Sequence, residues 1–328
     1  MLQVLLQKKA AHASILARAL EIPAVLSVKG ILQKVKNGDS IIIDGAYGEV
    51  FINPTQRTFS IYEKKKKKYE EHIEELKTFI NKSTETADGK KVMLAANIGG
   101  ADEAAKAVKA GAEGVGLFRT EFLFLNKNAL PTEEEQFEEY KKAAVLTKGM
   151  PLTIRTLDIG GDKDIPYMGL TKETNPFLGY RAIRFCLDRV DIFTTQLRAI
   201  LRASAYGSIR IMIPMITSVN EVRQVKDMIK KICSDLDHNG ISYDKNIQTG
   251  VMIETPAAAI MADAIAQEVD FFSIGTNDLT QYTIAVDRCN ENVAYLYSAF
   301  NPAVLRLIRR IIECAHNAGI EAGMCGEA

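Results

Sequence analysis

Short apolar runs alternate with longer amphipathic stretches along most of the chain, and this alternation begins after Gly89. Runs rich in β-branched and aromatic residues predict strands, and apolar positions at helical spacing predict helices. The predicted strands are Val92 to Asn97, Gly114 to Arg119, Pro151 to Asp158, Ile209 to Met215, Gly250 to Glu254, Phe271 to Asn277 and Ile320 to Cys325. The predicted helices include Ala101 to Ala110, Glu133 to Leu146, Asp191 to Ala203, Glu221 to Leu236, Ala257 to Ala266 and Pro302 to Ala318.

Seven strand and helix units in sequence predict a parallel α/β fold. The commonest such fold for about 240 residues is the (β/α)₈ barrel, of the TIM type. The chain stops just after the seventh strand, so seven of the eight units are present. We therefore expect a barrel over residues 87–328 that lacks its last unit.

The first part of the chain has a different pattern. Residues 10–28 predict a helix from about Ala13 to Leu20 and a strand after Pro23, and the sequence GDSIIIDGAYGEVFINP predicts a hairpin around Gly45 to Gly48. Such a short α/β segment buries little surface by itself. We interpret residues 1–58 as part of a small domain, and expect the chain to be truncated at both ends.

A long charged helix is predicted between these two parts, from Tyr62 to about Lys82. Apolar positions spaced three and four residues apart predict that one face of this helix is packed. These positions are Tyr69, Ile73, Leu76 and Ile80. The sequence thus predicts a helical linker over residues 59–86.

Composition excludes several classes of protein. The chain has 41 Lys and Arg and 41 Asp and Glu, so its net charge does not favour nucleic acid or an anionic membrane as a partner. Its five cysteines form no CxxC pair, and no apolar run reaches the eighteen or so residues that span a bilayer. These features predict a cytoplasmic protein that does not insert into a membrane.

Two neighbouring strands lead into carboxylates, Glu254 and Asp278. Parallel strands of a barrel end at the same rim, where active sites of this fold lie. Mg²⁺ usually takes one or two protein carboxylates, together with substrate phosphate oxygens and water. Either acid alone is more simply explained as a loop residue or helix cap, but the pair predicts a Mg²⁺ site.

The other strand ends carry further polar side chains. Guanidinium groups bind phosphate and carboxylate in a planar, bidentate way, so the arginines of this group indicate a small substrate with several negative charges. The pattern favours phosphoryl transfer over a set of structural ion pairs. The group comprises Asn97, Arg119, Arg155 with Asp158, Lys163 in the turn IGGDK, Asn277, Arg288 and Cys325.

Cys325 and His12 have two interpretations each. A thiol at the end of the last strand can be a nucleophile or a proton donor, although most free cysteines are inert packing residues. A phosphorylated histidine before the helix that is predicted from Ala13 would be stabilised by free N–H groups and the helix dipole. From the residues alone, His12 is better explained as an ordinary residue at a helix start.

Six motifs in order resemble the family of enzyme I, the phosphoenolpyruvate-protein phosphotransferase of the bacterial sugar phosphotransferase system. The motifs are GLFRTEFLF, TIRTLDIGGDK, NPFLGYRAIR, GVMIETPAA, FFSIGTNDLTQYTIAVDR and GMCGE. The segment HASILARALEIPAV resembles the phosphohistidine segment of that family. The resemblance implies a barrel that binds phosphoenolpyruvate (PEP) and Mg²⁺, preceded by part of a swivelling phosphohistidine domain.

The resemblance also implies roles for individual residues. Glu254 and Asp278 would bind Mg²⁺, Cys325 would protonate the enolate of pyruvate, and His12 would accept the phosphoryl group. PEP would be held by Arg119, Arg155, Asn277 and Arg288, with Lys163 and Arg181 nearby. The partners it implies are PEP, pyruvate, the phosphocarrier protein HPr and a second copy of the barrel in a homodimer.

The chain departs from the family pattern at two places. Lys8-Lys9-Ala10-Ala11 stands where the family usually has hydroxyl side chains before the histidine, and Asn301 stands where a histidine is expected. Two alternatives therefore stay open. One is a relative of pyruvate phosphate dikinase or PEP synthase, which share the PEP barrel, and the other is a non-catalytic PEP-binding remnant.

Overall fold

The computed structural model describes residue 17 and residues 22–26, 28–80, 82–125, 127–160, 165–169 and 173–326. The chain divides into two compact units, Met1–Lys82 and Ser83–Ala328, which are considered separately below. Among the described residues, no helix is both long and apolar enough to cross a membrane.

The first unit contains the expected hairpin. Strands β1 (Ile41–Asp44) and β2 (Glu49–Ile52) are antiparallel, after the short helix α2 (Ile31–Lys34). In the turn, Oδ1 of Asp44 accepts hydrogen bonds from the backbone N–H groups of Ala46 and Tyr47 at 3.1 and 3.2 Å. The predicted strand after Pro23 is wrong, since residues 22–26 and 28 form no strand. The helix predicted around His12 lies almost entirely outside the described residues.

The linker helix differs from its prediction in extent and packing. Helix α3 (Gln56–Lys77) begins six residues before Tyr62, because the side chain of Thr55 caps it by accepting a hydrogen bond from the N–H of Thr58. The predicted packed stripe is wrong. Tyr69 is 67% exposed and Leu76 is 48% exposed, and none of the α3 residues is buried.

The contact between α3 and the hairpin is made near the start of the helix instead. The rings of Phe51 and Tyr62 lie 5.0 Å apart, and the hydroxyl of Tyr62 donates to Glu49. The unit boundary lies after Lys82. The division of the chain at residues 58 and 86 remains a prediction, and the start of α3 places residue 58 inside the helix.

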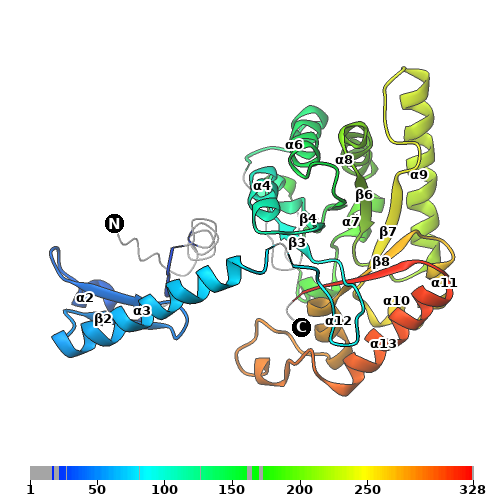
Figure 1. The fold of residues 1–328 in the computed structure, drawn as a ribbon. Helices are drawn as coiled ribbons and strands as arrows, with labels where there is room; N and C mark the ends of the chain where they lie inside the picture. Colours follow the sequence, from blue (N-terminus) through cyan, green and yellow to red (C-terminus); the bar gives the residue numbers. More distant parts are fainter. Residues whose placement is uncertain are drawn as a thin grey trace. The chain divides into compact units, whose positions relative to one another are not determined.

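The second unit confirms the barrel. Seven parallel strands are hydrogen-bonded in chain order, and the sheet curls so that β9 comes into contact with β4 (Figure 1). The strands are β3 (Ala95–Ile98), β4 (Gly114–Arg119), β5 (Leu152–Arg155), β6 (Ile209–Ile213), β7 (Gln248–Ile253), β8 (Phe271–Gly275) and β9 (Glu321–Cys325).

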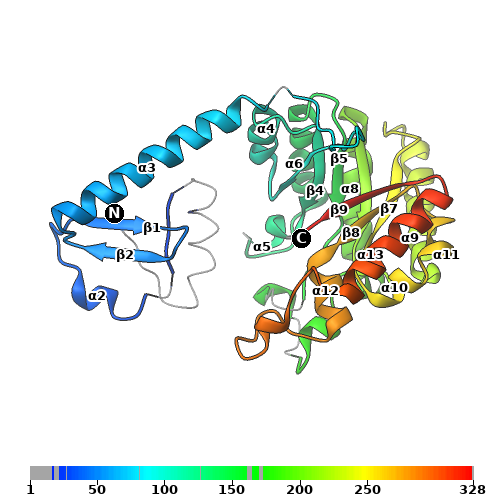
Figure 2. The same cartoon turned by 60° about the horizontal axis from the view of Figure 1, so that its bottom comes forward.

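Helices surround the outside of this curved sheet (Figure 2). They are α4 (Ala101–Lys109), α5 (Glu121–Leu125), α6 (Glu133–Leu146), α7 (Ile183–Asp188), α8 (Val190–Ala203), α9 (Val219–His238), α10 (Pro256–Ile260), α11 (Ala262–Ala266), α12 (Thr276–Ile284) and α13 (Pro302–Asn317). Single 3₁₀ turns are η1 (Pro166–Met168), η2 (Pro176–Leu178), η3 (Ser204–Tyr206) and η4 (Ala294–Leu296).

The two faces of the strands bury different residues, because successive side chains of a strand point to opposite faces. Phe272 and Ile274 belong to the main core, which includes helix residues such as Leu279. Phe271 belongs to a smaller cluster with Leu117, Met212 and Met252, against which Cys325 packs. Alternation along β8 therefore separates the core under the helices from the barrel interior.

Several predicted strands and helices have different boundaries in the structure, for example the strand predicted from Val92, which begins at Ala95. The strand predicted to reach Asn277 ends at Gly275, and Thr276 begins α12, so Asn277 lies in the first turn of a helix. The helix predicted from Ala257 is interrupted at Met261, which separates α10 from α11.

Asn301 has a structural role at the start of α13. Its side chain accepts a hydrogen bond from the N–H of Ala303 at 2.9 Å, and Pro302 occupies the first position of the helix. Asn is a favoured cap, and Pro is favoured at this first position. The departure from the family pattern at residue 301 therefore preserves a capped helix.

The close approach of β7 and β8 depends on Gly250. A Cβ atom at this position would lie 2.5 Å from the carbonyl oxygen of Phe271 and 2.6 Å from its ring. We expect Gly250→Ala to lower the free energy of unfolding of the barrel by ~1–3 kcal/mol, because the new methyl group overpacks the strand pair. Urea unfolding followed by circular dichroism measures this.

The control for this prediction is Gly323→Ala in β9. There the nearest heavy atom to a new Cβ is 3.8 Å away, which is an ordinary contact. Equal unfolding midpoints for the two variants would contradict the assignment of a close approach to Gly250.

Candidate active site

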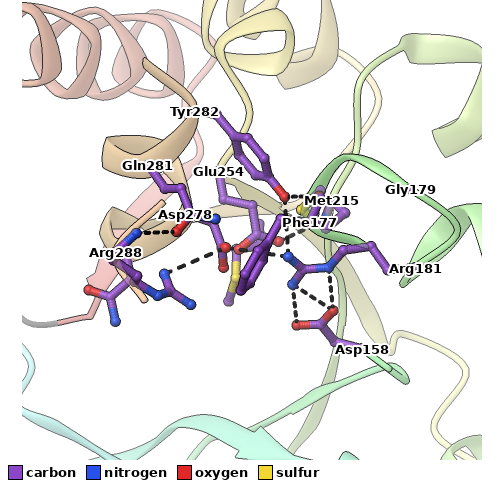
Figure 3. Close-up of polar contacts among 12 residues, drawn as sticks. Asp158, Phe177, Gly179, Arg181, Met215, Glu254, Asp278, Gln281, Tyr282 and Arg288 are labelled. Atoms are coloured by element: carbon purple, nitrogen blue, oxygen red, sulfur yellow. Dashed lines mark hydrogen bonds and ion pairs between the residues drawn. The ribbon is translucent and has the colours of Figure 1, made fainter. Parts of the chain in front are cut away.

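Polar and charged side chains from several parts of the chain meet at the carboxyl rim of the barrel, and Figure 3 shows Asp158, Arg181, Glu254, Asp278 and Arg288 among them. Arg119 and Arg155 end β4 and β5, Glu254 follows β7, and Cys325 ends β9. The loop after β5 and the segment from α12 onwards supply the rest. The parallel sheet thus brings together residues that lie far apart in the sequence.

Arg155 is the centre of a buried ion cluster. Its Nη2 donates to Oε1 of Glu121 at 2.7 Å and lies 3.2 Å from Oδ2 of Asp158. Burial opposes the charged form of Arg155, but Glu121 and Asp158 outweigh it and raise the pKa of the guanidinium. Arg155 therefore stays positively charged in the barrel interior.

Arg181 is held from three sides. Its Nη2 donates to both carboxylate oxygens of Asp158, at 2.9 and 3.2 Å. Its Nη1 donates to Oδ1 of Asp278 at 3.4 Å and to the hydroxyl of Tyr282 at 3.2 Å. Burial lowers and these anionic neighbours raise the pKa of Arg181, with a net increase. Arg181 thus joins the end of β5 to helix α12.

The surroundings of Glu254 disfavour its charged form. It is 1% exposed, and its Oε1 accepts a hydrogen bond from the N–H of Met215 at 2.7 Å. Burial, together with repulsion from Asp278 and Asp158, raises its pKa from 4.5 to about 8. Gly275 leaves room for it, because a Cβ there would lie 2.7 Å from Oε2 of Glu254. A cation beside Glu254 would relieve this repulsion.

Asp278 and Arg288 complete the other side of the rim. Asp278 lies in the first turn of α12, where the helix dipole favours a negative charge. Arg288 Nη1 lies 3.6 Å from Oδ1 of Asp278, and the N–H of Arg288 donates to Oε1 of Gln281 at 3.2 Å. Helix α12 therefore sets both the side chain and the backbone of Arg288.

Two arginines keep donors available. Among the described residues, the side chain of Arg119 has no hydrogen bond or ion pair, and it is only partly buried. The side chain of Arg288 is 30% exposed, and its Nη1 has no hydrogen-bond partner within the described part of the chain. Arg155 and Arg181 are by contrast buried and paired. Arg119 is therefore unpaired among the described residues, and Arg288 is partly exposed with a longer ion pair of 3.6 Å to Asp278.

Cys325 faces this cluster from the last strand. The hydroxyl of Ser273 donates to its Sγ at 3.6 Å. Burial raises the pKa of the thiol, Ser273 lowers it, and nearby Glu254 raises it further. The net increase keeps Cys325 protonated, which suits a proton donor better than a nucleophile.

The donor set fits a hard divalent cation. Within the described residues there is no group of three or more His, Cys, Asp or Glu that could hold a metal. Mg²⁺ does not require such a group, since it commonly uses one or two carboxylates and completes its shell with substrate oxygens and water. A cation bound between Glu254 and Asp278 would offset the repulsion between the two carboxylates.

The structure brings together most of the predicted site residues. Arg119, Arg155, Arg181, Glu254, Asn277, Asp278, Arg288 and Cys325 all lie at the rim, whereas His12 and Lys163 lie outside the described residues. Sequence reasoning did not assign Glu121, Gln281 or Tyr282 to the site. Glu121 comes two residues after the end of β4, so the rule of strand ends could have found it. Nothing in the sequence signals Tyr282.

Comparisons with known proteins agree with this geometry. The family described as "PEP-utilising enzyme, PEP-binding domain" matches residues 73–328. The chain belongs to this family of PEP-utilising enzymes. Residues 8–48 match "PEP-utilising enzyme, mobile domain". The part of the chain that precedes the barrel is therefore also similar to PEP-utilising enzymes.

Curated relatives at high identity carry a more specific name. The chain is 53% identical to the phosphoenolpyruvate-protein phosphotransferase of Geobacillus stearothermophilus over 97% of its own length and 55% of the relative's. It is 50% identical to the protein of the same name from Priestia megaterium, over 97% of this chain and 56% of that one. The chain thus spans about half the length of the curated relatives it matches.

The raised pKa of Glu254 predicts how stability changes with pH. Because the folded chain holds a proton that the unfolded chain has lost, its stability falls as pH rises from 4.5 to about 8. Glu254→Gln keeps the acceptor for Met215 and removes this loss. In chelator, its melting temperature should exceed that of the parent chain at pH 9, by about 2–4 °C for each kcal/mol regained, and match it near pH 4.5.

A matched control is Glu291→Gln, at an exposed carboxylate in the loop that follows Arg288. Its melting temperature should follow the parent chain at every pH. A constant difference between Glu254→Gln and the parent chain across the pH range would contradict the raised pKa.

Proposed function

We propose that this chain binds PEP and Mg²⁺ at the barrel rim and transfers the phosphoryl group of PEP to His12, with release of pyruvate. The observation that carries the proposal is the convergence of two partly exposed arginines, the acidic residues Glu254 and Asp278 and a protonated thiol at one rim. The family membership of the barrel and the name of its relatives support the same reaction. As part of the sugar phosphotransferase system, the reaction would take place in the cytoplasm.

The charges of the site match a small polyanion. Arg119, Arg155, Asn277 and Arg288 would hold PEP, with Lys163 and Arg181 nearby. Glu254 and Asp278 would hold Mg²⁺, which when bound neutralises phosphate oxygens and so favours transfer. The cation would offset the negative charge of deprotonated Glu254, and the arginines would offset the negative charge of the substrate.

The chemistry on the protein side has two parts. The bond between phosphorus and the enol oxygen of PEP breaks as a bond from phosphorus to a His12 ring nitrogen forms. The electron pair left on oxygen gives the enolate of pyruvate. Cys325 then donates its proton to the methylene carbon, which yields pyruvate, and the thiolate regains a proton from solvent. Arg119 and Arg288 would orient the carboxylate and phosphate throughout.

Two finer assignments belong to the same proposal. The phosphoryl group would pass onward to HPr, and the barrel would pair with a second copy. Both rest on the family resemblance.

The direct test is labelling with radioactive PEP in the presence of Mg²⁺. Parent chain should acquire label that is stable in base and labile in acid, as expected for a phosphohistidine, and His12→Ala should acquire none. His238→Ala serves as a control because His238 lies at the end of α9, away from the rim, and it should label normally.

Three outcomes separate the alternatives. Label that persists in His12→Ala would remove His12 as the acceptor. Binding of PEP without label or pyruvate would favour the non-catalytic alternative. ATP-dependent formation of PEP from pyruvate by the full-length gene product would favour pyruvate phosphate dikinase or PEP synthase.

Cys325 gives an independent prediction. If its thiol exchanges a proton with the carbon of pyruvate, the chain with Mg²⁺ in D₂O should exchange the methyl hydrogens of pyruvate for deuterium. Cys325→Ala should slow this exchange by about 10²- to 10⁴-fold, the usual contribution of a positioned acid. Proton NMR of the methyl signal measures the rate. Cys314→Ala in α13 is the control, and equal rates in the two variants would contradict the assignment.

A further inference from the structure

Several local hydrogen bonds to backbone groups hold the segment that carries η2 and leads to Arg181. Arg184 Nη1 donates to the carbonyl oxygens of Leu178 and Gly179 at 2.8 and 3.0 Å. The carboxylate of Glu173 accepts from the N–H of Tyr180 at 3.0 and 3.1 Å. These contacts are local, since all of the residues lie between 173 and 184.

One long-range contact joins this segment to α12. The hydroxyl of Tyr282 donates to the carbonyl oxygen of Phe177, which is 105 residues away in the sequence. The same hydroxyl accepts from Nη1 of Arg181 at 3.2 Å. A phenol has one proton to donate, so the hydrogen bonds run in one direction, from Arg181 through Tyr282 to Phe177.

Phe177 stands between two of the cations of the rim. Its ring centroid is 5.9 Å from the guanidinium carbon of Arg181 and 5.9 Å from that of Arg288. Figure 3 shows the ring between the two groups. Both guanidiniums also reach Oδ1 of Asp278, at 3.4 and 3.6 Å. The ring and the carboxylate thus separate two like charges that would otherwise repel.

We propose that Tyr282 is a positioning residue for the anion site. By fixing the backbone of Phe177, its hydroxyl sets the spacing of Arg181 and Arg288 across the Phe177 ring, and so the geometry in which PEP finds its donors. Tyr282 does not contact the substrate in this proposal. The inference rests on the proposed function, because PEP is the ligand whose binding it tunes.

Helix α12 then organises the rim through a single turn. Asp278, Gln281 and Tyr282 are spaced three and four residues apart, so they lie on one helical face. Asp278 holds both guanidiniums, Gln281 holds the backbone of Arg288, and Tyr282 holds the backbone of Phe177. Removal of the Tyr282 hydroxyl releases the backbone of Phe177 and also breaks the hydrogen bond that the hydroxyl accepts from Arg181.

The test uses Tyr282→Phe in the full 328-residue chain, which removes one oxygen atom and keeps the ring. Titration with PEP in the presence of Mg²⁺ should give a dissociation constant about tenfold higher than that of the parent chain, as expected when the hydrogen bonds of the hydroxyl to Phe177 and Arg181 are both lost. Tyr243→Phe is the matched control, since its hydroxyl donates to Asp237 on α9, away from the rim, and its dissociation constant should not change.

A double-mutant cycle separates positioning from a general loss of stability. Phe177→Leu removes the ring and keeps the carbonyl oxygen that Tyr282 holds. If Tyr282 acts by placing this ring, Tyr282→Phe should weaken PEP binding less than about twofold in the Phe177→Leu background. A full tenfold loss in both backgrounds would overturn the proposal, and so would unchanged PEP affinity in Tyr282→Phe alone.

A measurement without ligand distinguishes failure of this inference from failure of the proposed function. Hydrogen exchange of peptides that cover residues 175–181 should be faster in Tyr282→Phe than in the parent chain and unchanged in Tyr243→Phe. If the parent chain binds no PEP, the proposed function fails and faster exchange still supports the tether. Unchanged hydrogen exchange in Tyr282→Phe would overturn the proposed role of the hydrogen bond between Tyr282 and Phe177, whether or not the chain binds PEP.

Discussion

The site depends on one buried carboxylate, Asp158, which holds two guanidinium groups at once. It is 2% exposed, and it lies 3.2 Å from Nη2 of Arg155 and 2.9 Å from Nη2 of Arg181. Buried charges persist only when they are paired, and Asp158 is the partner that both arginines share, beside Glu121 for Arg155 and Asp278 for Arg181. The N–H of the preceding residue, Leu157, donates to Gln196 of α8 at 2.8 Å, which ties Asp158 to the helix layer.

A second constraint is the unequal distribution of charge around Glu254. Arg155 and Arg181 lower its pKa, but burial and the repulsion of Asp278 and Asp158 exceed their effect. The folded chain therefore disfavours the charged form of Glu254 at the barrel rim. Such tension is typical of functional sites, where the ligand supplies the compensating charge. It also explains why the substrate and the cation would bind together.

Helix α12 connects these two constraints. Its first turn places Asp278 opposite Glu254 and beside Arg181, and its next turn fixes the surroundings through Gln281 and Tyr282. The barrel sheet supplies the rigid support, while the segment that contains Phe177 is held to it by side chains from elsewhere. The rim thus divides into paired arginines that build the site and open arginines that would meet the ligand.

The sequence by itself determined the seven strands, most of their partners in the helix layer and the rim residues at strand ends, because strand periodicity and chain order specify a parallel barrel. It could not show that Asn277 and Asp278 lie in a helix, since α12 begins at Thr276 directly after the strand, with no loop between them. It also could not show that Tyr69 and Leu76 stay exposed. Helical spacing shows that apolar residues share one face of a helix, but it does not show whether another element packs against that face. The link between Tyr282 and Phe177 was decided only by the tertiary structure, which brings together residues 105 positions apart.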